Sequence, residues 1–275
     1  MPKLIAVLVG VVLGFSQLKP VLAHEFWIEP LDFVLDQGEP IAAHNRVGQM
    51  LKGDADPYIA STLVRFTLTD AEETRDVEGR LGDRPALKMK PERSGLHIAA
   101  YQSTVSVLRY RKPEKFERFA EKEGFPEVLG AHAARGLPEK DFREAYTRFG
   151  KSLIAVDDGA GVDRALGMRM EVVALTNPYT ESGPVNVKIL FEDAPLSDVQ
   201  IAIFRRDAAG EVTRETLRTN QKGLATIPRK SAEMTLLSAV HMIEPDTDLA
   251  ERKDVVWHSL WGHSLTVRLR GKRYA

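Results

Sequence analysis

The seven histidines are the residues of this chain with the clearest chemistry, because imidazole nitrogens bind copper, nickel and zinc ions. Cysteine is absent, which excludes disulfides and thiolate metal sites. His24 is the first candidate ligand, since it becomes the N-terminal residue if a signal peptidase cuts after Ala23. Its α-amino group and its imidazole Nδ1 could then close a chelate ring on one ion. The competing interpretation is that His24 is merely the residue left at the cleavage site.

Four further histidines are candidate partners for His24, because such a chelate needs at least one more imidazole. They are His241, His97, His258 and His263. Alternation within the apolar run 236–242 places His241 on the apolar face of a strand, where the alternative to a ligand is a hydrogen-bonded core residue. His258 and His263 are five residues apart, a spacing that suits one face of neither a helix nor a single strand. They could still converge through a loop at Gly262, and solvent exposure or local hydrogen bonding is their alternative role.

The chain begins with a short leader. Lys3 supplies a positive charge, residues 4–15 form an apolar run, and Val21 and Ala23 supply the pattern that a signal peptidase recognises. We therefore predict that residues 1–23 are a signal peptide and that the protein is periplasmic or secreted, with an uncleaved anchor as the alternative. The run is shorter than the roughly 20 apolar residues that span a bilayer, and we expect no membrane span in the mature chain.

Charge and motifs limit the classes of function. Without residues 1–23, the chain has 36 basic and 39 acidic side chains and a formal charge of −3. This balance predicts neither nucleic acid nor an anionic membrane as the main partner. The sequence lacks a nucleophile elbow, a phosphate-binding loop, a dinucleotide fingerprint and a paired-histidine zinc helix. We expect no enzyme, and copper-dependent oxidation of a polysaccharide is the enzymatic alternative that an N-terminal histidine raises.

Short β-branched and apolar runs separated by turn residues predict a mainly β fold. In the first half of the chain, the predicted strands are 41–47, 62–68 and 97–108. In the second half, they are 168–175, 185–191, 199–204, 211–219, 223–228, 235–242 and 264–269. Strands of this length and spacing are typical of β-sandwiches of the immunoglobulin-like or Greek-key kind.

A helical insert is expected between the two β regions. One helix is predicted over 113–123 and a second over 138–153, because each segment has apolar residues at i, i+3 and i+4. The predicted organisation after the signal peptide is a first β-sandwich module (24–112), a helical insert (113–153) and a second β-sandwich module (154–275).

Several segments spread over the mature chain resemble one protein family. They are His24-Glu25-Phe26-Trp27-Ile28-Glu29-Pro30, Asn177-Pro178-Tyr179, 187–191, 219–225, Val240-His241-Met242 and Trp257-His258-Ser259-Leu260-Trp261. In these segments the chain resembles the domain-of-unknown-function 4198 family. The chain departs from the family pattern at His258, where an acid is usual, and at His263. The resemblance implies a β-rich periplasmic or secreted protein that serves as a periplasmic component of nickel or cobalt uptake.

We expect from these observations a protein that binds a transition-metal ion through His24 and one or more imidazoles of the other module. The ion would be nickel, copper, cobalt or zinc, and the protein would deliver it to a membrane metal transporter or sense it for one. The other class that stays open is an envelope interaction module without metal, which binds a protein or a glycan.

Overall fold

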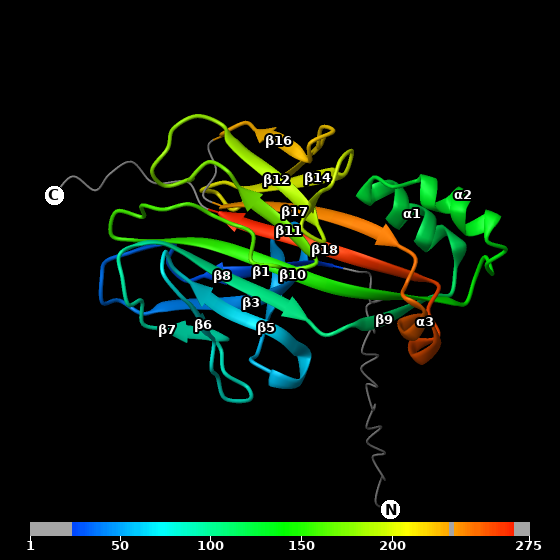
Figure 1. Ribbon diagram of the computed structural model, residues 1–275, viewed down its shortest axis with the longest axis horizontal. Helices are drawn as coiled ribbons and strands as arrows, with labels where there is room; N and C mark the ends of the chain where they lie inside the picture. Colours follow the sequence, from blue (N-terminus) through cyan, green and yellow to red (C-terminus); the bar gives the residue numbers. More distant parts are fainter. Residues whose placement is uncertain (1–23, 231–233, 267–275) are drawn as a thin grey trace, which may run out of the picture.

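The computed structural model describes residues 24–230 and 234–266, and the predicted signal peptide lies outside these residues. The largest sheet contains β2 (Val34–Leu35), β5 (Leu63–Thr69), β6 (Thr74–Asp76), β8 (Gly95–Ser103), β9 (Ser106–Tyr110), β10 (Phe142–Val156), β14 (Gln200–Arg206), β15 (Val212–Arg218), β17 (Met234–Ile243) and β18 (Trp257–Thr266). Its strand order is β15-β14-β17-β18-β10-β8-β5-β6, and β2 and β9 also pair with β10 (Figure 1). The central pair β10 and β18 is parallel, which makes the sheet mixed.

Two four-stranded sheets cover this large sheet. The first contains β1 (Glu25–Pro30), β3 (Ile41–Gln49), β4 (Lys52–Asp56) and β7 (Leu87–Met89), and the second contains β11 (Met170–Ala174), β12 (Val185–Phe191), β13 (Ala194–Pro195) and β16 (Leu224–Ile227). Ile154 of β10 belongs to the core under the first sheet, whereas Phe149 belongs to the core under the second. Because even and odd positions of a strand point to opposite faces, the two small sheets lie on opposite faces of β10. The predicted mainly β, sandwich-like fold is confirmed.

The predicted helix over 138–153 is wrong, because β10 occupies this segment as a 15-residue strand. Phe142 and Tyr146 share a face in a helix, but positions four apart also share a face in a strand, so their spacing does not distinguish the two. Nearly every residue of β10 is buried, since both of its faces are covered. A strand of this kind lacks the polar alternation by which strands are recognised.

One of the two predicted helices is confirmed, and other segments of the chain form helices that were not predicted. The predicted first helix is confirmed as α1 (Pro113–Glu123), which has proline at its start and ends at Gly124 with φ of +83°. Two helices were not predicted: α2 (Glu127–Ala134), and α3 (Thr247–Lys253) in the acidic segment before β18. A short 3₁₀ turn spans Ala60–Thr62. Figure 1 shows α1 and α2 together at one end of the large sheet.

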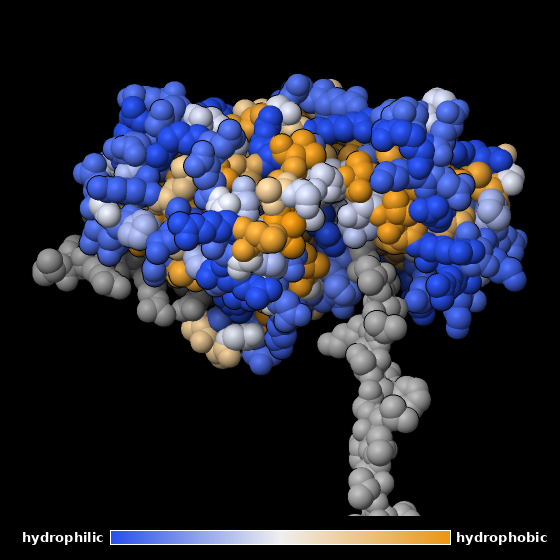
Figure 2. Space-filling model, turned by 90° about the horizontal axis from the view of Figure 1, so that it is seen from below, coloured by the Kyte–Doolittle hydropathy of each residue, from blue (hydrophilic) through white to orange (hydrophobic). Residues whose placement is uncertain are grey.

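The predicted strands correspond to observed strands, with ends that differ by a few residues. The predicted strand over 97–108 is split into β8 and β9, and part of the predicted strand over 264–269 lies outside the described residues. The division into modules at 112 and 154 stays a prediction, although one sheet contains strands from both modules. Of the helices in the described ranges, none has the length and apolar character needed to cross a membrane. The face drawn in Figure 2 is largely hydrophilic, with apolar residues gathered near its middle.

Candidate functional site

His24 directly precedes β1, an edge strand that pairs antiparallel with β3. The three residues that follow it are buried, with relative exposures of 3% for Glu25, 2% for Phe26 and 0% for Trp27. Phe26 stacks on Tyr101 of the large sheet at a ring-centroid distance of 4.4 Å. The chain is therefore fixed in the core immediately after the predicted cleavage site, and His24 has a defined place at the start of a strand.

His263 is brought to the start of β1. The backbone N–H of Phe26 donates a hydrogen bond to Nε2 of His263, with 3.4 Å between the two nitrogens. The His263 ring is 1% exposed and stacks on Trp261 at 6.0 Å. Burial lowers the pKa of this imidazole to about 3, so the ring is neutral at physiological pH. A neutral imidazole therefore lies two residues from His24, and its Nε2 lone pair accepts the N–H of Phe26.

His241 and His258 lie near each other, but on the other face of β18 from His263. In the β17–β18 pairing, His241 is opposite Leu260 and Ile243 is opposite His258, so the two imidazoles share a face. The His258 Nε2 lies 2.9 Å from Oγ1 of Thr147, and burial lowers the pKa of the His258 imidazole to about 4. The odd spacing of residues 258 and 263, which excludes one face of a strand for both, agrees with this arrangement, and Gly262 lies within β18 rather than in a loop.

His97 is not brought to His24. It is fully buried in β8, with its Nδ1 3.2 Å from the carbonyl oxygen of Gly95. His97 is opposite Ile154 of β10, whereas the Phe26 ring lies against Gly150. Four residues of strand separate these two positions, which corresponds to about 13 Å.

Residues 24–230 and 234–266 contain no group of three or more His, Asp or Glu side chains arranged to hold a metal ion. A metal site in this part of the chain must therefore use fewer side chains, supplemented by backbone groups. The α-amine of a cleaved His24 is such a group, and it would add a second nitrogen from the same residue.

Two buried polar clusters along β10 were missed by the sequence analysis. In the first, the Glu144 carboxylate accepts hydrogen bonds from Tyr110 Oη, at 2.7 Å, and from Ser259 Oγ. Burial raises the pKa of Glu144 to about 7. In the second, Lys151 forms ion pairs with Asp163 and Glu171. No motif signals either cluster, because each joins residues from separate elements.

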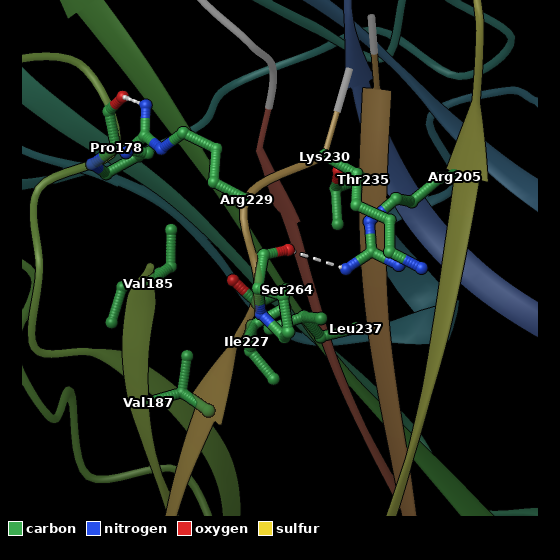
Figure 3. A pocket seen from close by; sticks show the side chains of 12 residues that line it. Pro178, Val185, Val187, Arg205, Ile227, Arg229, Lys230, Thr235, Leu237 and Ser264 are labelled. Atoms are coloured by element: carbon green, nitrogen blue, oxygen red, sulfur yellow. Dashed lines mark hydrogen bonds between the residues drawn. The ribbon is translucent and has the colours of Figure 1, made fainter. Parts of the chain in front are cut away.

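A small pocket with a cavity volume of about 50 Å³ opens between the second small sheet and the large sheet (Figure 3). Its apolar lining includes Val185, Val187, Ile227 and Leu237, and its cations are Arg205, Arg229 and Lys230. Arg205 donates to Pro228 O at 2.9 Å and to Glu215 Oε2 at 3.0 Å. Glu215 also forms an ion pair with Lys230. The three cations of the pocket therefore have one carboxylate between them. The pocket combines an apolar wall with a net positive mouth.

The comparisons with known proteins concern the family rather than an activity. A search of the curated proteins finds no match. Among solved structures, the chain is similar to the crystal structure of a tetra-tandem repeat in the extending region of a large adhesion protein, at 10% sequence identity and a TM-score of 0.22. That alignment covers 90% of this chain and 49% of the other, so the chain spans about half of its length. The family model described as Domain of unknown function (DUF4198) matches residues 21–243, and the chain belongs to this family.

Proposed function

We propose that the protein, after cleavage behind Ala23, binds one transition-metal ion through the α-amine and Nδ1 of His24 and through Nε2 of His263. The observation that carries this proposal is the 3.4 Å contact between the backbone nitrogen of Phe26 and Nε2 of His263, two residues after His24. In the periplasm or outside the cell, the protein would deliver nickel, cobalt or copper to a membrane metal transporter or sense it for one.

The chemistry of these donors suits such an ion. The three atoms are nitrogens of borderline softness, which favour copper and nickel over calcium or magnesium. Because burial lowers the pKa of His263 to about 3, no titrating proton occupies its Nε2 near neutral pH. The ion would take this lone pair in place of the long 3.4 Å hydrogen bond from the N–H of Phe26. The rings of Phe26 and Trp261 flank this imidazole at 6.4 Å and 6.0 Å between centroids and limit its rotation. A restrained second imidazole lowers the entropy lost when the ion binds.

Metal affinity tests this proposal when three proteins with defined N-termini are compared. The mature chain that begins at His24 should bind copper or nickel tightly in a competition titration with a coloured chelator. A chain with one extra residue before His24 should bind at least about tenfold more weakly, since its α-amine is removed from the chelate. The His263→Gln variant should weaken binding similarly, because it removes the imidazole and keeps a polar side chain.

His258→Gln is the matched control for His263→Gln, because both histidines are buried in β18 and point to opposite faces. It should leave the affinity unchanged. Equal affinities for the authentic and the extended N-terminus would overturn the proposal. A loss confined to His258→Gln would instead locate the ion at the imidazoles of His241 and His258.

The second candidate is an interaction module without metal, and the pocket beside Arg205 favours it. Its apolar wall suits a short apolar group, and its cations suit an anionic group attached to it. An envelope protein or glycan could carry both groups. A short branched carboxylic acid should therefore raise the melting temperature of the protein, whereas the matching amide should not. Leu237→Trp, which fills the pocket, should abolish the effect. Equal effects of acid and amide would exclude a site that recognises the anion.

A further inference from the structure

A fully buried lysine and two buried carboxylates meet between the large sheet and the connector 157–169. Lys151 comes from β10, Asp163 from the connector and Glu171 from β11, and their side chains are 1%, 1% and 0% exposed. The Lys151 Nζ lies 2.6 Å from Oδ1 of Asp163 and 3.5 Å from Oε2 of Glu171. The nitrogen of one side chain is therefore held against the carboxyl group of another in a place that excludes water.

Backbone groups fix the orientation of the two carboxyl groups. The N–H of Ala174 donates to Oδ2 of Asp163 at 2.7 Å, and the N–H of Met168 donates to Oε1 of Glu171 at 2.7 Å. Neither carboxyl group can turn away from Lys151 without losing these hydrogen bonds. Reacting groups that are oriented in this way reach effective concentrations of about 10⁵–10⁸ M.

We propose that Lys151 and Asp163 condense to an intramolecular amide bond, with Glu171 as the proton carrier. This inference is independent of metal binding. In the low-dielectric interior, transfer of a proton from the Lys151 ammonium to Glu171 removes two charges and leaves a nucleophilic amine. The Nζ–Cγ bond then forms and the Cγ–Oδ1 bond breaks. Nζ loses two of its three protons, one of them by way of Glu171. Both protons end on Oδ1, which leaves as one water molecule, and Glu171 returns to its carboxylate form.

The product keeps two hydrogen bonds of the cluster and loses one, the 2.8 Å bond from the N–H of Arg164 to Oδ1 of Asp163. Oδ2 of Asp163 becomes the amide oxygen and keeps the N–H of Ala174 as its donor. The remaining hydrogen on Nζ can be donated to the carbonyl oxygen of Arg164, which already lies 2.8 Å from Nζ. The amide also replaces the buried Lys151–Asp163 ion pair, whose desolvation is costly, by a neutral group. The Glu171 carboxylate then keeps the N–H groups of Leu166 and Met168 as its donors. Hydrolysis of the amide would require the released water to stay in a cluster that excludes water.

The intact mass of the mature wild-type chain tests the proposal directly. It should lie below the sequence mass by one water molecule, and trypsin should not cleave after Lys151. Tandem mass spectrometry should locate the loss in a branched peptide that joins residues 151 and 163. Dilute alkali should leave the loss unchanged, because it hydrolyses a succinimide at Asp158-Gly159 but does not hydrolyse an amide.

Three variants sharpen the measurement. Asp163→Asn should lose one ammonia molecule instead of water and reach the same final mass as the wild type, because the two amides are identical. Lys151→Arg should keep its full sequence mass, since a guanidinium is not nucleophilic at neutral pH. Glu171→Gln should also keep its full mass, because an amide cannot carry the proton. A wild-type chain at full sequence mass that trypsin cleaves after Lys151 would overturn the proposal, as would a water loss located at Asp158.

Discussion

Glu144 and Lys151 lie seven residues apart on β10, and the protein accommodates their buried charges in different ways. Glu144 points toward Tyr110 and Ser259 and has no cation among the partners described, whereas Lys151 contacts two carboxylates. The two side chains occupy opposite faces of the strand, since their positions differ by an odd number. The pKa of Glu144, which burial raises to about 7, favours its neutral form below that pH, whereas the Lys151 cluster sets one cation against two carboxylates. The cost of disturbing each should differ accordingly.

The largest effect is expected for Lys151→Met. This change leaves Asp163 and Glu171 buried without a cation, and removal of one partner of a buried ion pair costs about 3–5 kcal/mol. Loss of the proposed amide would act in the same direction. Urea denaturation at pH 7 measures the free energy of unfolding of the variant and the wild type.

Lys122→Met is the matched control, because Lys122 also contacts two carboxylates, those of Glu25 and Glu123, each at 3.0 Å. The side chain of Lys122 is 40% exposed, whereas those of Glu25 and Glu123 are 4% and 5% exposed, so solvent reaches the cation of this cluster and the expected loss is smaller than in Lys151→Met. Equal losses in the two variants would contradict the distinction between a buried and a screened cluster.

The next largest effect concerns pH and Glu144. Its pKa is about 7 in the folded protein against an ordinary value of 4.5, so the folded state holds its proton more tightly than the unfolded state does. The stabilisation is fully present below pH 4.5 and is lost as the pH rises through 7, by about 3 kcal/mol in total. Glu144→Gln mimics the protonated form and should remove this decrease. Urea denaturation at pH 5 and pH 8 measures the decrease in the free energy of unfolding between these two values. The same decrease in the variant and in the wild type would show that the Glu144 carboxyl group stays hydrated.

His263 should show the opposite dependence. Its pKa is lowered from 6.5 to about 3 by burial, so the unfolded state binds the proton more tightly. The stability that it contributes is present above pH 6.5 and decreases as the pH falls toward 3, by about 2 kcal/mol at pH 5. In a plot of the free energy of unfolding against pH, His263→Gln should reduce the decrease on the acid side, whereas Glu144→Gln should reduce the decrease on the alkaline side. If one variant reduces the decrease on both the acid and the alkaline side, the two groups titrate together rather than separately.

The sequence predicted those features that depend on neighbouring residues. The odd spacing of His258 and His263 excluded one face of a strand for both, and proline and glycine marked the ends of α1. It could not distinguish β10 from a helix, because spacings of four residues are common to both and burial on two faces removes alternation. The contact between His263 and Phe26 spans 237 residues, and the Lys151 cluster joins residues of β10, the connector 157–169 and β11. Such contacts arise from topology, which local patterns do not encode.

The smallest expected effect is that of Tyr110→Phe, which removes one hydroxyl donor to Glu144 and keeps the aromatic packing. A hydrogen bond of this kind contributes about 1 kcal/mol when Glu144 is protonated, and about 1.5–3 kcal/mol when it is charged. The loss of stability should therefore be larger at pH 8 than at pH 5. Tyr58→Phe, whose hydroxyl lies 3.4 Å from Val77 O at a partly buried place, should cost less and show no such pH dependence. A pH-independent loss in Tyr110→Phe would mean that Glu144 stays protonated throughout this range, which would strengthen the contrast with the charged cluster around Lys151.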